Sequence, residues 1–245
     1  IKAMGFGQPD PRAVQAGLRY LDMPEMRKAL EAFANYHVDA VGDIALRAIA
    51  TGQNPYQTAA QIAGYIENAP ASDALRFART FQIWSLREGT LAGWRSLPEG
   101  TVKGWTWISA RDKRCCMGCI SLHGTVHPLT ERLNDHHYGR CTPVPITPTW
   151  AELGFEDGQE VVGQTGEAWF NAQNRSTQIE MMGRSRWLAW QDRAFNFGDL
   201  STIYSDDVYG QMRRESGLSD LVGEQAARDY QRRAIRHRAQ QERPN

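Results

Sequence analysis

The sequence predicts an α+β fold that is mainly α-helical, with helical N- and C-terminal parts flanking a small, irregular β-sheet stapled by zinc. Apolar residues recur at intervals of three and four through the first hundred residues, and helical patterns return after Trp150. The stretch between them has the glycines, prolines and short apolar runs of strands, and it holds all four cysteines. We therefore expect a helical part over residues 1–97, a small β zinc-loop module over 98–150 and a helical part over 151–245.

Composition excludes several classes of protein. Hydrophobic residues make up 41% of the 245 residues, enough to bury a core, so wholesale disorder is not expected. The 28 Lys and Arg balance the 28 Asp and Glu, which argues against a surface that binds nucleic acid everywhere but leaves local patches open. We find no run of about 18 apolar residues and no signal peptide, so we expect no membrane association. Because the chain starts at Ile1, we expect a longer gene product upstream.

Four helices are expected in the N-terminal part, over residues 11–21, 25–51, 55–67 and 73–94. Gly52 is typical of the residue that follows a helix. Asn54 followed by Pro55 is typical of an N-cap and a first helical turn.

Extended segments are expected at 102–108, 124–129 and 142–148. Pro143 and Pro145 in the last of these have no backbone N–H to donate, so this segment belongs at a sheet edge. Further helices are expected over residues 167–174, 176–193 and 218–238, with a turn or short helix over 199–210.

Cysteine and histidine are concentrated in one short stretch. The chain has four Cys and six His, and all but two of these ten residues lie between positions 115 and 141. They are Cys115, Cys116, Cys119, His123, His127, His136, His137 and Cys141. Such clustering, without a secretion signal, favours a metal site over a disulfide scaffold.

The spacing suggests which of these residues bind the metal. Structural zinc takes four Cys or His ligands in a tetrahedron, and a Cys-x-x-Cys turn supplies two of them. We predict Cys116, Cys119, His136 and Cys141 as the ligands, and we expect Gly118 to allow a positive φ in the first turn. The alternates are Cys115 for Cys116 and His137 for His136.

Other interpretations of the cluster remain open. The cysteines could be small buried residues, or Cys119 and Cys141 could form a disulfide. A catalytic zinc would keep an open position beside an acidic base, for which Glu131 and Asp135 are near in sequence. No His-Glu-x-x-His or deaminase motif is present, so we expect a closed, structural site and no enzymatic activity.

Several motifs occur in an order that resembles the phage Mu F-like head morphogenesis proteins. The resemblance covers about residues 73–145. Its motifs are Phe77-Ala78-Arg79-Thr80, Gly104-Trp105-Thr106-Trp107, Asp112 to Cys119, Leu122 to Val126, and His136 to Cys141 followed by Pro143. The chain departs from the family pattern at Phe81, where Glu is frequent, and at Gly139, where the late motif often has its first Cys.

The resemblance implies a minor capsid protein. Such a protein acts in head morphogenesis and in DNA packaging or ejection, lies inside the virion head near the portal, and is made in the host cytoplasm. Its expected partners are the portal protein, major capsid or scaffolding proteins, and packaged double-stranded DNA. The departure at Gly139 removes one possible ligand and leaves the fourth position to His136 or His137.

A basic segment near the C-terminus is the other candidate site. Its arginines are Arg228, Arg232, Arg233, Arg236 and Arg238. They could contact DNA phosphates or an acidic portal surface, or they could form a solvated helix end whose cations favour the helix dipole. A zinc-dependent enzyme and a plain DNA-binding module are the alternatives to a capsid protein.

Overall fold

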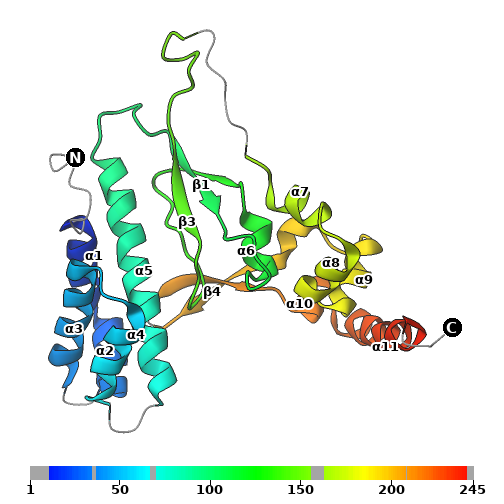
Figure 1. Ribbon diagram of the computed structural model, residues 1–245, viewed down its shortest axis with the longest axis horizontal. Coiled ribbons are helices and arrows are strands. Elements are labelled where there is room, and N and C mark those ends of the chain that lie inside the picture. Colours follow the sequence, from blue (N-terminus) through cyan, green and yellow to red (C-terminus); the bar gives the residue numbers. More distant parts are fainter. Residues whose placement is uncertain (1–10, 35–36, 67–69, 156–162, 208, 242–245) are drawn as a thin grey trace. The chain divides into compact units, whose positions relative to one another are not determined.

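A computed structural model describes residues 11–34, 37–66, 70–155, 163–207 and 209–241 (Figure 1). The fold is mainly helical with a small antiparallel sheet, as the sequence predicts. Contacts divide the chain into two units. The first comprises residues 1–105, 127–148 and 205–212, and the second comprises 106–126, 149–204 and 213–245. In the described part of the chain, no helix has the length and apolar character needed to cross a membrane.

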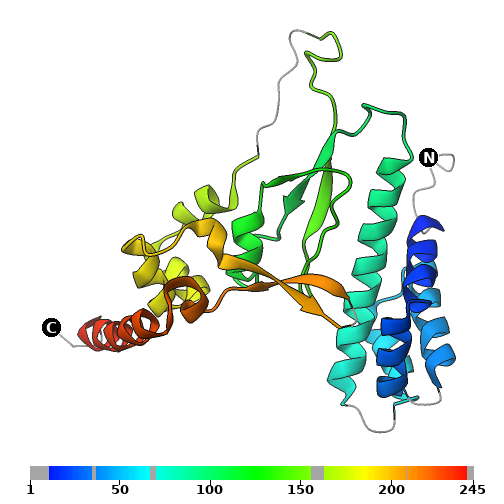
Figure 2. The ribbon, with the colours of Figure 1, turned by 180° about the vertical axis from the view of Figure 1, so that it is seen from behind.

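The first unit contains a bundle of helices. They are α1 (Pro11–Leu21), α2 (Pro24–Ala34), α3 (Val38–Thr51), α4 (Pro55–Ala63) and α5 (Ala71–Arg95), which lie side by side in Figures 1 and 2. α1 and α5 approach closely, because a Cβ on Gly89 would lie 2.5 Å from the backbone nitrogen of Ala13. Tyr20 and Phe81 are fully buried in this bundle, and their rings stack at 5.9 Å.

The predictions for this bundle are largely confirmed. The side chain of Asn54 caps α4 by accepting a hydrogen bond from the N–H of Tyr56 at 2.9 Å, and Gly52 has the left-handed φ of 65°. The single helix predicted over 25–51 is wrong, because the structure has α2 and α3 as separate helices there. α4 ends at Ala63, and the end predicted for it, residue 67, lies outside the described residues.

Two small sheets complete the architecture. β1 (Gly104–Ile108) lies between β2 (Val126–His127) and β3 (Thr142–Ile146), so the proline-containing strand is at an edge, as predicted. β4 (Ser201–Asp206) and β5 (Gly210–Glu215) pair as a second sheet, so the turn or short helix predicted over 199–210 is wrong. Among the described residues of this hairpin, only Tyr209 and Met212 are buried apolar residues, so the alternating pattern that marks a strand is weak.

The second unit packs short helices around a core of its own. They are α6 (Met117–Leu122), α7 (Gly166–Asn171), α8 (Arg175–Met182), α9 (Arg184–Gln191), the 3-10 turn Phe197–Leu200, α10 (Leu218–Val222) and α11 (Glu224–Gln241). Met117, Ile120, Phe170 and Met182 are fully buried in the core cluster of this unit.

Two continuous helices predicted in this region are each broken. Gly183 separates α8 from α9, and Gly223 separates α10 from α11. Both glycines have φ of 80°, which a continuing helix does not allow. The predictions over 176–193 and 218–238 are therefore wrong in continuity, although most of their residues are helical.

Candidate metal centre

The first pair of sulfur ligands comes from the turn that opens α6. Cys116 is the N-cap of this helix, and its Sγ accepts a hydrogen bond from the backbone N–H of Cys119 at 3.3 Å. Cys119 is buried, with 4% of its surface exposed. One turn thus holds two sulfur atoms in a fixed arrangement.

Gly118 has a different role from the one expected. It lies inside α6 and is not among the glycines with positive φ. A Cβ at this position would lie 3.1 Å from the carbonyl oxygen of Leu200 and 3.2 Å from Cα of Glu215. The glycine is therefore needed for close packing of α6. Glu215 also accepts a hydrogen bond from the N–H of Met117 at 2.8 Å, which fixes the start of the helix.

The second pair of predicted ligands lies in a loop that is anchored to α5. The guanidinium of Arg87, a residue only 5% exposed, donates to the carbonyl oxygens of Gly139 at 3.1 Å and Cys141 at 2.8 Å. It also forms a 2.9 Å ion pair with the buried carboxylate of Asp135. That carboxylate accepts hydrogen bonds from the backbone N–H groups of His136 at 2.9 Å and Cys141 at 3.2 Å. One buried ion pair therefore holds the backbone of both predicted ligands.

The hydrogen bonds of His136 orient its ring for metal binding. Its Nδ1 lies 2.7 Å from the carbonyl oxygen of His137. Because a carbonyl only accepts, Nδ1 carries a proton, and in the neutral ring the lone pair is therefore on Nε2. A hydrogen bond of this kind commonly fixes the tautomer of a metal-binding histidine. His137 instead places its Nε2 3.2 Å from the carboxylate of Asp206.

Cys115 and His123 lie outside the predicted ligand set and have contacts of their own. A side-chain hydrogen bond with Cys119 lowers the pKa of the Cys115 thiol, and Cys115 packs against the core of the second unit. Burial lowers the pKa of His123, whose Nδ1 accepts from the N–H of Ser109 at 3.0 Å.

His127 also has a structural setting. Its ring stacks on Trp105 with centroids 4.3 Å apart, and its Nδ1 lies 3.1 Å from the carboxylate of Glu131. Each of these contacts explains the position of the histidine without a metal.

Two groups of three side chains among the described residues could hold a metal ion. One is Cys116, Cys119 and His136, and the other is Cys119, Asp135 and Cys141, with ligand atoms within 4.8 Å of one another in each group. Together they contain the four predicted ligands, whereas the alternates Cys115 and His137 belong to neither. All four cysteines are free thiols, so the structure has no disulfide between Cys119 and Cys141. The donor set of three sulfurs and one imidazole nitrogen fits zinc.

Asp135 and Arg87 are the residues that sequence reasoning missed. Asp135 was considered only as a base for a catalytic metal, yet its carboxylate is 1% exposed and already accepts from Arg87 and two backbone amides. The sequence feature that could have pointed to Arg87 is its position in the same predicted helix as Thr80, seven residues further along. Arg87 and Thr80 both contact the loop. Arg87 donates to its backbone carbonyls, and the hydroxyl of Thr80 accepts from the N–H of Tyr138 at 3.3 Å.

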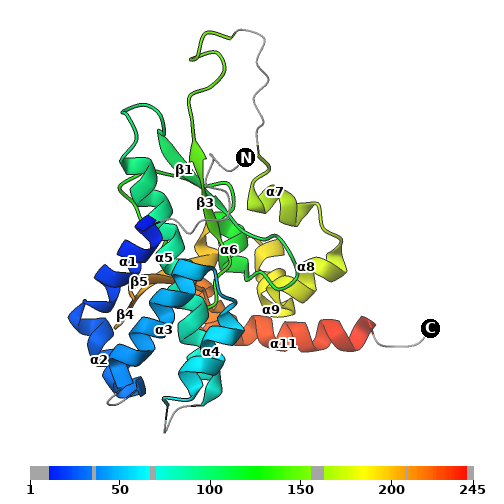
Figure 3. The same ribbon diagram turned by 60° about the vertical axis from the view of Figure 1, so that its left-hand side comes forward.

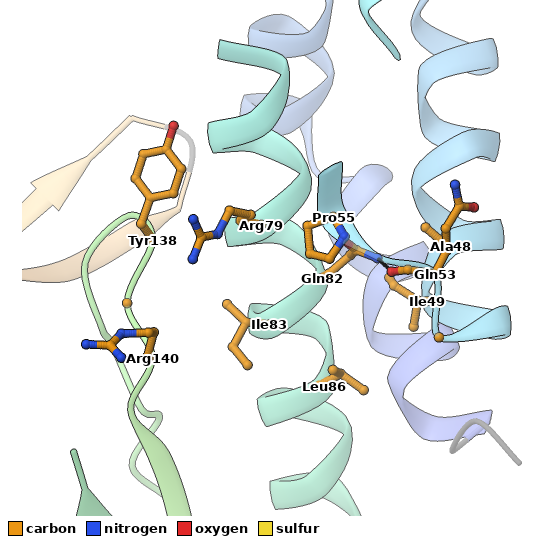
Figure 4. A pocket seen from close by; sticks show the side chains of 12 residues that line it. Ala48, Ile49, Gln53, Pro55, Arg79, Gln82, Ile83, Leu86, Tyr138 and Arg140 are labelled. Atoms are coloured by element: carbon orange, nitrogen blue, oxygen red, sulfur yellow. Dashed lines mark hydrogen bonds between the residues drawn. The ribbon is translucent and has the colours of Figure 1, made fainter. Parts of the chain in front are cut away.

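The same loop lines a pocket with α3 and α5, with a volume of about 350 Å³ (Figure 4). Ile49, Ile83 and Leu86 make much of its wall apolar. At its rim the guanidinium of Arg79 lies 5.3 Å from the centre of the Tyr138 ring, a cation–π contact. Tyr138 has a φ of 60°, so its strained backbone depends on these surrounding contacts.

The C-terminal arginines prove to be mostly paired. Arg228 lies 3.5 Å from Glu224, Arg232 lies 2.5 Å from Asp229, and Arg233 pairs with Asp192. Arg236 and Arg238 are exposed on α11. The internal carboxylates therefore balance much of the charge that was expected to face DNA or the portal.

Comparisons with known proteins identify no relative. No protein-family model, no curated protein sequence and no solved structure matches this chain.

Proposed function

We propose that this chain is a structural protein of a phage head, acting in head morphogenesis near the portal and held together by one structural zinc ion. The observation that carries the proposal is that Cys119 belongs to two groups of possible ligands, one with Cys116 and His136 and the other with Asp135 and Cys141. The cysteines and the histidine of these groups belong to the ordered motifs that resemble the Mu F-like proteins. Two residues of the other motifs also have defined contacts. Thr80 accepts a hydrogen bond from the loop, and Trp105 stacks on His127 of the sheet.

The proposed site is closed and structural. A catalytic zinc needs an open position and a nearby base that is able to exchange protons. Asp135 is buried against Arg87, and Glu131 lies beside the imidazole of His127. Four soft or borderline ligands and two occupied carboxylates favour a metal that stabilises the fold, so the zinc-dependent enzyme is the weaker alternative.

The metal is tested by elemental analysis of the full chain purified without chelator. We expect one zinc per chain, and Cys119→Ala and Cys141→Ala should each lose it. His127→Ala should retain it, because its Nδ1 is committed to Glu131. Metal retained in both cysteine variants would contradict the proposed ligand set.

The place of the protein is tested separately. Purified virions and isolated portal rings are probed for the chain by mass spectrometry. We expect a few copies per virion, enriched with the portal. A chain found only free in the cytoplasm of infected cells would contradict the capsid proposal while leaving the metal site standing.

A further inference from the structure

An unusual group of cations surrounds His237 of α11, in the second unit. Arg175 begins α8 and Arg184 begins α9, and these helices lie near α11 (Figure 3). Nη2 of Arg175 lies 2.7 Å from Nε2 of His237, and Nη1 of Arg184 lies 2.6 Å from Nδ1 of the same ring. Both nitrogens of one imidazole therefore face a guanidinium.

In this group the hydrogen-bond donors outnumber the acceptors. A guanidinium only donates, and a neutral imidazole has one acceptor nitrogen and one N–H. At least one of the two contacts therefore places an N–H against an N–H. No carboxylate in the described part of the chain pairs with Arg175, whose partners are His237 and Trp187. Arg175 and His237 thus bring more N–H donors than acceptors to this point, and an anion with several oxygen atoms would satisfy them.

The group is held in place before any ligand binds. The guanidinium of Arg175 lies over the ring of Trp187, 4.9 Å from its centre, and Trp187 is only 7% exposed. The Trp187 Nε1 donates to the side chain of Gln178 at 3.1 Å, which fixes the ring. A stacked guanidinium keeps its N–H groups in the plane, free to form a bidentate contact with phosphate. Burial and the neighbouring Arg184, Arg175 and Arg233 lower the pKa of His237, as expected beside concentrated positive charge.

We propose that Arg175, Arg184 and His237 form a phosphate-binding site whose occupant is a phosphodiester of double-stranded DNA. The charge of α11 favours a polyanion over a small anion. In this helix Arg228, Arg232 and Arg233 are paired with carboxylates, whereas Arg236 and Arg238, which flank His237 in the sequence, are exposed. At 1.5 Å per residue, the 18 residues of the helix extend roughly 27 Å, which spans several phosphates. The choice of DNA as the source of the phosphate rests on the proposed function, whereas the anion site does not.

The test is fluorescence anisotropy of a labelled DNA duplex titrated with the zinc-loaded full chain at several salt concentrations. We expect Arg175→Gln with Arg184→Gln to weaken binding about tenfold or more. The slope of log K against log salt is negative, and its magnitude should decrease by about one to two. Each phosphate contact that is lost removes about one counterion from those released on binding. The matched control, Arg228→Gln with Arg232→Gln, removes the same charge from residues paired with Glu224 and Asp229. We expect the control to change affinity less than threefold.

A third variant separates a binding role from a structural one. His237→Glu places a carboxylate between the two guanidiniums, so it should raise the melting temperature while abolishing DNA binding. Equal losses in the two double variants, or unchanged binding in His237→Glu, would overturn the proposal. Inorganic phosphate that binds at this site while the duplex does not would overturn the assignment to DNA. These outcomes leave zinc content and virion location unaffected, so failure here is distinguishable from failure of the proposed function.

Discussion

Gly139 lies between the predicted ligands His136 and Cys141, and the structure gives a physical reason for the glycine. A Cβ at this position would lie 2.0 Å from Oδ2 of Asp135. That carboxylate cannot easily move, because Arg87 and two backbone amides hold it. A cysteine at 139 would therefore displace the group that orients the predicted ligands.

We predict that Gly139→Ala lowers the free energy of unfolding by about 1–3 kcal/mol, the usual cost of overpacking a buried site. Urea unfolding followed by tryptophan fluorescence measures this. The control is Gly198→Ala, where no heavy atom lies within 4 Å of the added Cβ. Equal effects of the two substitutions would show that the loop tolerates a side chain at 139.

The buried ion pair of Arg87 and Asp135 supports a second prediction for single residues. Arg87→Met should cost about 3–5 kcal/mol, because it leaves a buried carboxylate without its partner. Arg132→Met is the control, since its pair with Glu88 has an Arg side chain that is 43% exposed. Pairs of that kind contribute about 0–1 kcal/mol. Chemical denaturation at one zinc concentration measures the free energy of unfolding of both variants. Equal losses would show that the Arg87 pair contributes no more than an exposed pair.

The sequence identified the cluster at residue scale but could not choose within it. Spacing alone left Cys115 beside Cys116 and His137 beside His136 as alternates. The discriminating contacts come from distant segments, such as Asp206, which binds His137, and Ser109, which binds His123. Arg87, in α5, was invisible for the same reason, because its function depends on a loop about fifty residues further along the chain.

At the scale of elements, helical periodicity was a good guide to where helices occur and a poor guide to where they stop. The breaks at Gly183 and Gly223 depend on the backbone of one residue each, because both glycines have φ of 80°. Gly223 has φ of 80° and ψ of 159°, a region that is nearly restricted to glycine. The β4–β5 hairpin was missed for another reason, because its exposed strands lack a clear apolar alternation.

Gly223→Ala should therefore destabilise the protein by about 1–3 kcal/mol through backbone strain alone, since no atom crowds the position. Gly64→Ala provides a control of opposite sign. Its φ of −68° is compatible with alanine, so this substitution should stabilise by about 0.4–1 kcal/mol by restricting the unfolded chain. Thermal melts of the two variants measure both effects. A stabilising Gly223→Ala would show that the helix break is not maintained by glycine.

At the scale of the whole molecule, the proposed metal is a ligand whose binding residues are separated in the sequence, so only the folded chain can bind it with all of them. A ligand that binds only the folded state stabilises it by mass action, by about 4 kcal/mol at a free concentration one thousand times its dissociation constant. Structural zinc sites are also where metal binding and folding are most strongly coupled. The metal should therefore contribute to the stability of the whole chain.

Chelation should lower the urea midpoint of the wild-type chain, and added zinc should restore it. In Cys119→Ala, the midpoint should already be low and should not respond to chelator or zinc, because a ligand shared by both three-residue groups is missing. His127→Ala should respond like the wild type, which separates metal loss from general damage to the cluster. A wild-type midpoint that is unchanged by complete removal of zinc, verified by elemental analysis, would show that the fold does not depend on the metal. The four residues would then be explained by packing alone.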